Sequence, residues 1–237
     1  MAESILTKTW ESYNDNLGLL SLFAIPAVIS TFLIFLLPNY VSLSGVFLRW
    51  GSVFHQDLTL ANSLLIAGVF IVALALFSFG VAAINVVVKQ QRTLTRLSHY
   101  EMEEIEEATL TLFLVLLGAF VAVLLFNILL GDVEAPVLRN LFALVVSLIV
   151  LFAPQAIVID RYGVGRAIKG SLRIMMTKTR SFVFFLFVAS IVLMAFSWLF
   201  LYFPAGRIIS LVFHAIILLP FFEVFKTQIY LSRYSLL

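Results

Sequence analysis

Six long apolar segments divide this chain, and they constrain its fold more than any other feature. A helix needs about 20 mostly apolar residues to cross the ~30 Å hydrocarbon core of a bilayer. Hydrophobic residues make up 62% of the chain and charged residues 12%. A soluble protein of this length could not bury so many apolar residues in its core. We therefore expect an all-α integral membrane protein, with one transmembrane domain (1–237) whose six transmembrane helices form three hairpins. The six segments are 17–37, 60–88, 108–130, 140–159, 182–203 and 208–225.

The Lys and Arg residues fall on alternate sides of these segments. Twelve of the fifteen lie before the first segment, between the second and third, between the fourth and fifth, or after the sixth. Cytoplasmic loops of membrane proteins carry an excess of cations. We therefore expect both termini to lie in the cytoplasm and the protein to be a multi-pass protein of the cell membrane. The opposite side carries Arg49, Arg139 and Arg207.

Two of the cytoplasmic segments have the apolar spacing of an amphipathic helix. In such a helix the apolar residues recur every three or four positions and form one face. The helix then lies in the membrane interface with its apolar face toward the lipid. Near the amino terminus this face consists of Leu6, Trp10, Tyr13 and Leu17.

The second amphipathic helix is expected between the fourth and fifth apolar segments. Its opposite face is basic, and Arg166, Lys169 and Arg173 are candidates to contact anionic lipid headgroups. Membrane lipids are therefore the expected partners of this helix. Its apolar face consists of Val164, Ile168, Leu172 and Met175.

The second, fourth and sixth apolar segments share a pattern near their cytoplasmic ends. Each has a helix-weakening residue at the same place (Gly80, Pro154 or Pro220), followed by about two apolar turns and then charge. Proline removes one helical hydrogen bond and usually bends the helix, so these positions are candidate helix breaks. The pattern predicts a threefold repeat with units 1–88, 89–162 and 163–237, each beginning with a cytoplasmic amphipathic or charged helix. The alternative is that Gly and Pro are simply commoner in membrane helices.

The overall layout is similar to that of a known group of membrane proteins. Residues 167–173 (AIKGSLR) lead into an apolar span, and a proline-broken span runs from Pro220 to residues 230–233 (YLSR). Both features resemble the YciC-type membrane proteins and the membrane domain attached to some glycerophosphodiester phosphodiesterases. The resemblance covers nearly the whole chain and implies the six-helix architecture. It implies no catalytic residue, and this chain has no soluble phosphodiesterase domain.

An acidic run precedes the third apolar segment. On a helix, His99, Glu103 and Glu106 or Glu107 would share a face with a spacing that could bind a divalent cation. A second element with converging ligands is missing from the sequence, so we predict no metal site. We expect a solvated or salt-bridged helix face, with docking of a partner as a further alternative. The run consists of Glu101, Glu103, Glu104, Glu106 and Glu107.

His214, Glu223 and Lys226 form a candidate polar site within the last segment. Charged groups at membrane depth are expensive and often functional; the alternative places Glu223 and Lys226 at the interface, where Lys226 reaches the headgroups. His214 is expected to turn inward and hydrogen-bond across the bundle. The other polar residues in the apolar segments, for which we expect hydrogen bonds between helices, are Asn62, Asn85, Asn127, Ser147 and Gln155.

The residue patterns favour a role without catalysis. The chain lacks cysteine, a catalytic triad and a nucleotide-binding motif, and its net charge of +2 gives no reason to expect nucleic acid. We expect no cofactor. The favoured function is membrane organisation, or service as an accessory subunit that contacts lipid or a membrane or cytoplasmic partner protein.

Two other functions stay open. A small transporter, channel or lipid-handling permease would place a central site beside the broken helices. A membrane-embedded enzyme acting on lipid would need His214, Glu223 and the acidic run to converge.

Overall fold

The structure, a computed structural model, describes residues 2–35, 60–90, 99–130 and 136–234. All regular secondary structure in these ranges is helical, in agreement with the expected all-α class. The last two residues of the first expected span (36–37) lie outside the described residues. The elements are α1 (Ala2–Asp15), α2 (Leu17–Phe35), α3 (Leu60–Lys89), α4 (His99–Leu130), α5 (Pro136–Val150), α6 (Ala153–Asp160), α7 (Val164–Thr177), α8 (Thr179–Phe200), α9 (Gly206–Phe213), η2 (a π-helical turn, His214–Leu218) and α10 (Leu219–Leu231).

Five of the helical stretches described are long and apolar enough to cross a membrane. A sixth is obtained if α1 and α2, which meet at an angle of 85°, are counted as one span. The protein is therefore a helical, membrane-embedded protein. The five spans are Ala67–Lys89, His99–Leu130, Val137–Asp160, Thr179–Phe200 and Ile208–Leu231.

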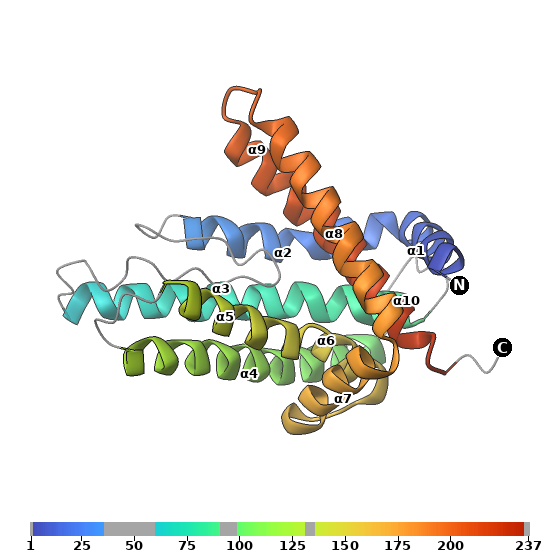
Figure 1. Cartoon of the computed structure of the whole chain (residues 1–237), viewed down its shortest axis with the longest axis horizontal. Helices are drawn as coiled ribbons and strands as arrows, with labels where there is room; N and C mark the ends of the chain where they lie inside the picture. The colour runs from blue at the N-terminus through green and yellow to red at the C-terminus, as the bar shows by residue number, and fades with distance from the viewer. Residues whose placement is uncertain (1, 36–59, 91–98, 131–135, 235–237) are drawn as a thin grey trace.

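The helices form a bundle with one hairpin that diverges from the rest. Figure 1 shows α2, α3, α4 and α5 side by side, whereas α8 and α9 run away from them at a steep angle. The short helices α1 and α7 lie at the same end of the bundle as the end of α10. The amphipathic helices and the two ends of the described chain thus gather on one side.

The three expected helix breaks have different outcomes. The span Val137–Asp160 is interrupted at Leu151 and Phe152, and Pro154 occupies the first turn of the new helix α6. Pro220 likewise lies in the first turn of α10, directly after the π-helical turn. A proline fits there because the first helical turn needs no amide donors.

The break expected at Gly80 is wrong, because α3 runs without interruption from Leu60 to Lys89. A glycine can remain helical, and here it allows a close approach to α2. A Cβ atom built on Gly80 would lie 2.8 Å from the carbonyl oxygen of Phe23. Gly80 is therefore a packing position between two spans.

One part of the core lies where α3, α6 and α10 pack against one another. Residues 81–88 of α3 and 153–158 of α6 are buried throughout. Aromatic rings from α8 cover this core, with Phe185 5.3 Å from Phe225 and 6.4 Å from Phe152 between ring centroids. Each buried side chain of this size contributes about 1.5–3 kcal/mol in water, but in lipid the close packing itself matters more.

Candidate functional site

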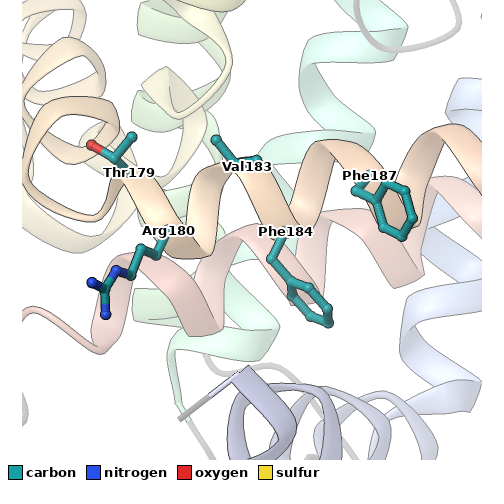
Figure 2. A pocket seen from close by; sticks show the side chains of 5 residues that line it. All are labelled: Thr179, Arg180, Val183, Phe184 and Phe187. Atoms are coloured by element: carbon teal, nitrogen blue, oxygen red, sulfur yellow. The ribbon is translucent and has the colours of Figure 1, made fainter.

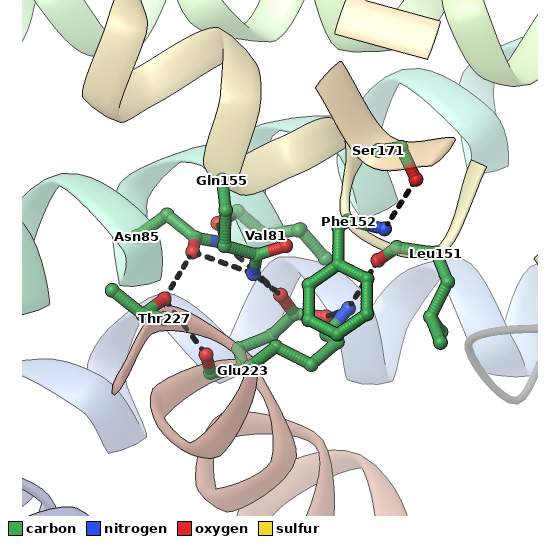
Figure 3. A network of polar contacts seen from close by, with 9 residues as sticks. Val81, Asn85, Leu151, Phe152, Gln155, Ser171, Glu223 and Thr227 are labelled. Atoms are coloured by element: carbon green, nitrogen blue, oxygen red, sulfur yellow. Dashed lines mark hydrogen bonds and ion pairs between the residues drawn. The ribbon is translucent and has the colours of Figure 1, made fainter. Parts of the chain in front are cut away.

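Five buried polar side chains meet at the junction of α3, α6 and α10, and we call them the central polar cluster (Figure 3). Each of the three helices contributes at least one of them. Two of the five carry charge, in a region of the helices that is otherwise apolar. The members are Asn85 from α3, Gln155 from α6, and Glu223, Lys226 and Thr227 from α10.

A charged pair lies at the heart of the cluster. The Nζ atom of Lys226 is 2.6 Å from Oε1 of Glu223, one helical turn away, and the two residues are 5% and 3% exposed. The second carboxylate oxygen of Glu223 accepts hydrogen bonds from Nδ2 of Asn85 (3.1 Å) and Nε2 of Gln155 (2.9 Å). Buried charges are tolerated when they are paired and fully hydrogen-bonded. Glu223 meets both conditions with groups from three helices.

Asn85 connects the remaining members of the cluster. Its side-chain oxygen accepts a hydrogen bond of 2.9 Å from Nε2 of Gln155 and lies 2.7 Å from Oγ1 of Thr227. Its Nδ2 atom also donates to the carbonyl oxygen of Val81, 2.8 Å away in the same helix. The side-chain oxygen of Gln155 is buried and has no hydrogen-bond partner in the described part of the chain.

The break between α5 and α6 supplies two backbone groups to the same region. The carbonyl oxygen of Leu151 accepts a hydrogen bond of 3.2 Å from Nζ of Lys226. The amide of Phe152 donates to Oγ of Ser171 in α7, 3.0 Å away. Unpaired backbone groups in a membrane cost several kcal/mol each. The interrupted span is therefore held by side chains from α7 and α10.

The cluster can hold helices together electrostatically, since its charges cancel and its donors face acceptors. The candidate breaks beside it are closely packed. Gly80, Pro154 and Pro220 are all buried. The close contact of Gly80 with the Phe23 backbone leaves no room for even a methyl group.

His214 does not join Glu223 and Lys226. Its Nδ1 atom lies 2.5 Å from the carbonyl oxygen of Ser210 and 3.2 Å from its Oγ, both one turn earlier on the same stretch of helix. The half-buried ring thus bonds within its own span, where a hydrogen bond across the bundle was expected. Asn127 behaves in the same way, donating to the carbonyl oxygen of Val123. The side chain of Asn62 lies outside the described residues.

The acidic run begins α4 and is divided between two environments. Glu104 is buried, forms an ion pair with Lys89 of α3 and lies 3.9 Å from Arg161. Nζ of Lys89 also donates to the carbonyl oxygen of Val158, 3.0 Å away in α6. Glu103, Glu106 and Glu107 are exposed. The prediction of a solvated or salt-bridged helix face is confirmed for Glu104 and for the three exposed glutamates, whereas Glu101 is buried.

A second ionic group fixes the end of α10 to the end of α6. Asp160 accepts a hydrogen bond of 2.6 Å from the Tyr230 hydroxyl, and it also contacts Arg233 and the Tyr234 hydroxyl. The Arg233 guanidinium lies 4.5 and 4.4 Å from the centroids of these two tyrosine rings. Partial burial and the hydrogen bond to Asp160 raise the pKa of Tyr234 above its usual value. At the end of α6, a hydrogen bond to Tyr100 raises the pKa of Arg161.

Helix α7 forms as expected and has three distinct faces. Small residues face the protein: a Cβ atom on Gly170 would lie 3.2 Å from Cβ of Ala156 in α6. The cations Arg166, Lys169 and Arg173 are exposed on another face. The expected apolar face forms the third, and its residues Val164, Ile168, Leu172 and Met175 are exposed or half-buried.

Helix α1 also forms as expected, and a stripe beside its expected apolar face packs against the protein. Its most buried side chains are Ile5, Thr9 and Tyr13, whereas Trp10 is exposed. The Tyr13 ring contacts Phe221 of α10 at 5.7 Å between centroids. Of the expected apolar face, Tyr13 contacts the protein, whereas Trp10 and Leu17 remain exposed.

Sequence reasoning did not single out Thr227 and Ser171 as members of a site. The weak signal for Thr227 is its position four residues after Glu223 on the same helix face. Ser171 gives no such signal, because its partner is a backbone group. The amide of Phe152 is free to donate to Ser171 only because the helix is interrupted at Phe152. Comparison of the chain with family models, with curated proteins and with solved structures finds no match.

Proposed function

We propose that this protein organises the membrane around it, or serves as an accessory subunit there, by presenting α7 to anionic lipid. The observation that carries the proposal is the three-faced arrangement of α7. One face fixes the helix to the bundle through Gly170 and Ser171, which leaves the cationic and apolar faces uncovered. A helix with adjacent cationic and apolar faces suits a lipid interface.

The central polar cluster supports a rigid scaffold in this role. Its paired charges and hydrogen bonds join α3, α6 and α10, the second spans of the three proposed repeat units, and the close packing at Gly80 adds α2 to them. We therefore retain the threefold repeat of three hairpins and the six-span topology as parts of the proposal. The cationic side of the bundle, with α1, α7 and both termini, would face the cytoplasm of the cell under the positive-inside rule.

The lipid role is tested by thermal unfolding of the purified protein in nanodiscs of phosphatidylglycerol or phosphatidylcholine. We expect the protein to be more stable in the anionic lipid. Replacing Arg166, Lys169 and Arg173 together by Gln should remove most of this difference, because each cation near an anionic surface contributes about 1 kcal/mol.

A matched control replaces the exposed carboxylates Glu103, Glu106 and Glu107 of α4 by Gln. This variant should keep the preference for anionic lipid or increase it, since it removes negative charge from the same end of the bundle. Equal stability of the unmodified protein in both lipids would contradict the proposed lipid role.

A small transporter or lipid permease is the second candidate, favoured by the charged pair Glu223–Lys226 within the last span. The close packing at Gly80, Pro154 and Pro220 weighs against it, because a central site needs space beside such positions. Movement or chemical modification of a substrate by the pure protein in liposomes would favour transport or catalysis over the organising role.

A further inference from the structure

A groove follows the first turns of α8, the helix that leads away from the bundle (Figure 2). Its wall is apolar except at the end nearest α7, where Arg180 and Thr179 lie. The spacing of its members places them along one stripe of the helix. The lining residues are Thr179, Arg180, Val183, Phe184 and Phe187.

The apolar part of the groove packs against α10 through Phe184, whereas Val183 and Phe187 are exposed. The Phe184 ring packs edge-on against Phe225 of α10, 6.1 Å between centroids, and is half-buried. Val183 and Phe187 are 55% and 64% exposed. The stripe from Arg180 to Phe187 covers about 10 Å of helix, enough for the upper part of an acyl chain to lie along it.

The cation at the end of the groove is available for a ligand. Arg180 is exposed and makes no hydrogen bond or ion pair within the part of the chain that the structure describes. Its neighbour Lys178 is engaged, since its Nζ atom donates to the carbonyl oxygen of Ser232, 3.2 Å away. The groove thus offers one free guanidinium at the start of a candidate span, next to an apolar wall further along the same helix.

We propose that this groove binds one anionic glycerophospholipid, with its headgroup phosphate on Arg180 and an acyl chain along Val183, Phe184 and Phe187. Guanidinium groups bind phosphate through parallel N–H donors. The order of the two chemistries along α8 matches that of a phospholipid, charged at the interface and apolar below it. The inference rests on the proposed lipid role, and it names a single binding position distinct from the broad cationic face of α7.

The test replaces Phe187 by the photoreactive analogue benzoylphenylalanine in the full chain. The protein is reconstituted in vesicles with equal amounts of phosphatidylglycerol and phosphatidylcholine, and mass spectrometry identifies the headgroups of crosslinked lipids. We expect about fivefold enrichment of phosphatidylglycerol, the effect of one cation near an anionic headgroup. The matched control places the analogue at Met194, which is 69% exposed on the same helix and about two turns further along; there the adducts should follow the bulk ratio.

The variant Arg180→Gln should return the adducts at position 187 to the bulk ratio, and Arg180→Lys should keep most of the enrichment. Crosslinking at the bulk ratio in the unmodified background, or enrichment that survives Arg180→Gln, would overturn the proposal. The α7 variant separates the two lipid hypotheses. Suppose that replacing Arg166, Lys169 and Arg173 by Gln abolishes the lipid dependence of stability but leaves the enrichment at position 187. Lipid binding by α7 and by the groove on α8 are then both supported. If stability does not depend on lipid in the unmodified protein but the enrichment persists, only the proposed role of α7 is wrong.

Discussion

Lys226 holds its ammonium group 2.6 Å from a carboxylate oxygen of Glu223, with both side chains almost completely buried at the junction of three helices. Because neither charge reaches water, each depends on the other. The stability of the bundle should therefore depend on this pair, and also on the close contacts of uncharged residues near it.

Removing one member of the pair should be much more damaging than removing both. Lys226→Met leaves the Glu223 carboxylate without its cation, and Glu223→Gln leaves the Lys226 ammonium without its anion; we expect a loss of about 3–5 kcal/mol for each. The double variant should lose clearly less than the sum of the two single variants. Unfolding in detergent, analysed as a double-mutant cycle, measures the coupling.

The exposed pair His99–Glu103 provides the control for that experiment. Glu103→Gln should change stability by no more than about 0.5 kcal/mol. Additive effects of the two changes at positions 223 and 226 would show that the buried pair is not coupled.

A methyl group should be tolerated at one glycine of α3 and not at another. A Cβ atom on Gly80 would lie 2.8 Å from the Phe23 carbonyl oxygen, whereas one on Gly68 would meet nothing within 4 Å. We expect Gly80→Ala to destabilise the protein by about 1–3 kcal/mol, the cost of overpacking, and Gly68→Ala to be neutral or slightly stabilising. Thermal unfolding of the two variants measures this difference in stability. Equal changes in stability would contradict the close contact of α2 with α3.

The hydroxyl of Ser171 should protect one particular amide. Ser171→Ala removes the acceptor of the Phe152 N–H group at the break between α5 and α6, which leaves a buried donor unpaired at a cost of about 1–3 kcal/mol. Hydrogen exchange should accelerate in the peptide that contains Phe152. Thr177→Ala, at an exposed position of the same helix, should leave that exchange unchanged; unaltered exchange in the Ser171 variant would exclude the contact.

High pH should loosen the attachment of the carboxyl end to α6. Partial burial and Asp160 raise the pKa of the Tyr234 phenol above its usual value of 10.0. A group with a raised pKa in the folded state contributes stability that is complete below the usual pKa and is lost as the pH rises through the raised value. The phenolate absorbance difference between the protein and Tyr234→Phe gives the midpoint, which Asp160→Asn should shift downward; a midpoint at or below 10.0 in the unmodified protein would be the contrary result.

The sequence identifies the spans and the charged pair because each stands out locally. An apolar run of 20 residues needs a lipid environment whatever its neighbours are, and Glu223 and Lys226 are conspicuous within such a run. The partners of Glu223 are different in kind. Asn85 and Gln155 lie 138 and 68 residues earlier, and local periodicity does not encode which polar residues of distant spans will meet.

Gly80 and His214 illustrate the same limit. A glycine in a helix weakens it and also permits close approach, and in α3 the contact with Phe23 determines which of the two effects is seen. A histidine in a span needs a hydrogen bond, and Ser210 provides one within the same span. In both cases the sequence identifies the requirement, and the surrounding packing determines how it is met.

The interruption of the span Val137–Asp160 has a consequence for the order in which the chain is built. The carbonyl oxygen of Leu151 is satisfied by Lys226, which a ribosome adds 75 residues later. Until α10 has been synthesised and inserted, α5 and α6 must reside in the bilayer while the carbonyl oxygen of Leu151 lacks the hydrogen bond from Lys226. A nascent chain truncated before α10 should therefore remain associated with an insertion factor or with water, and release into lipid should accompany the arrival of the final span.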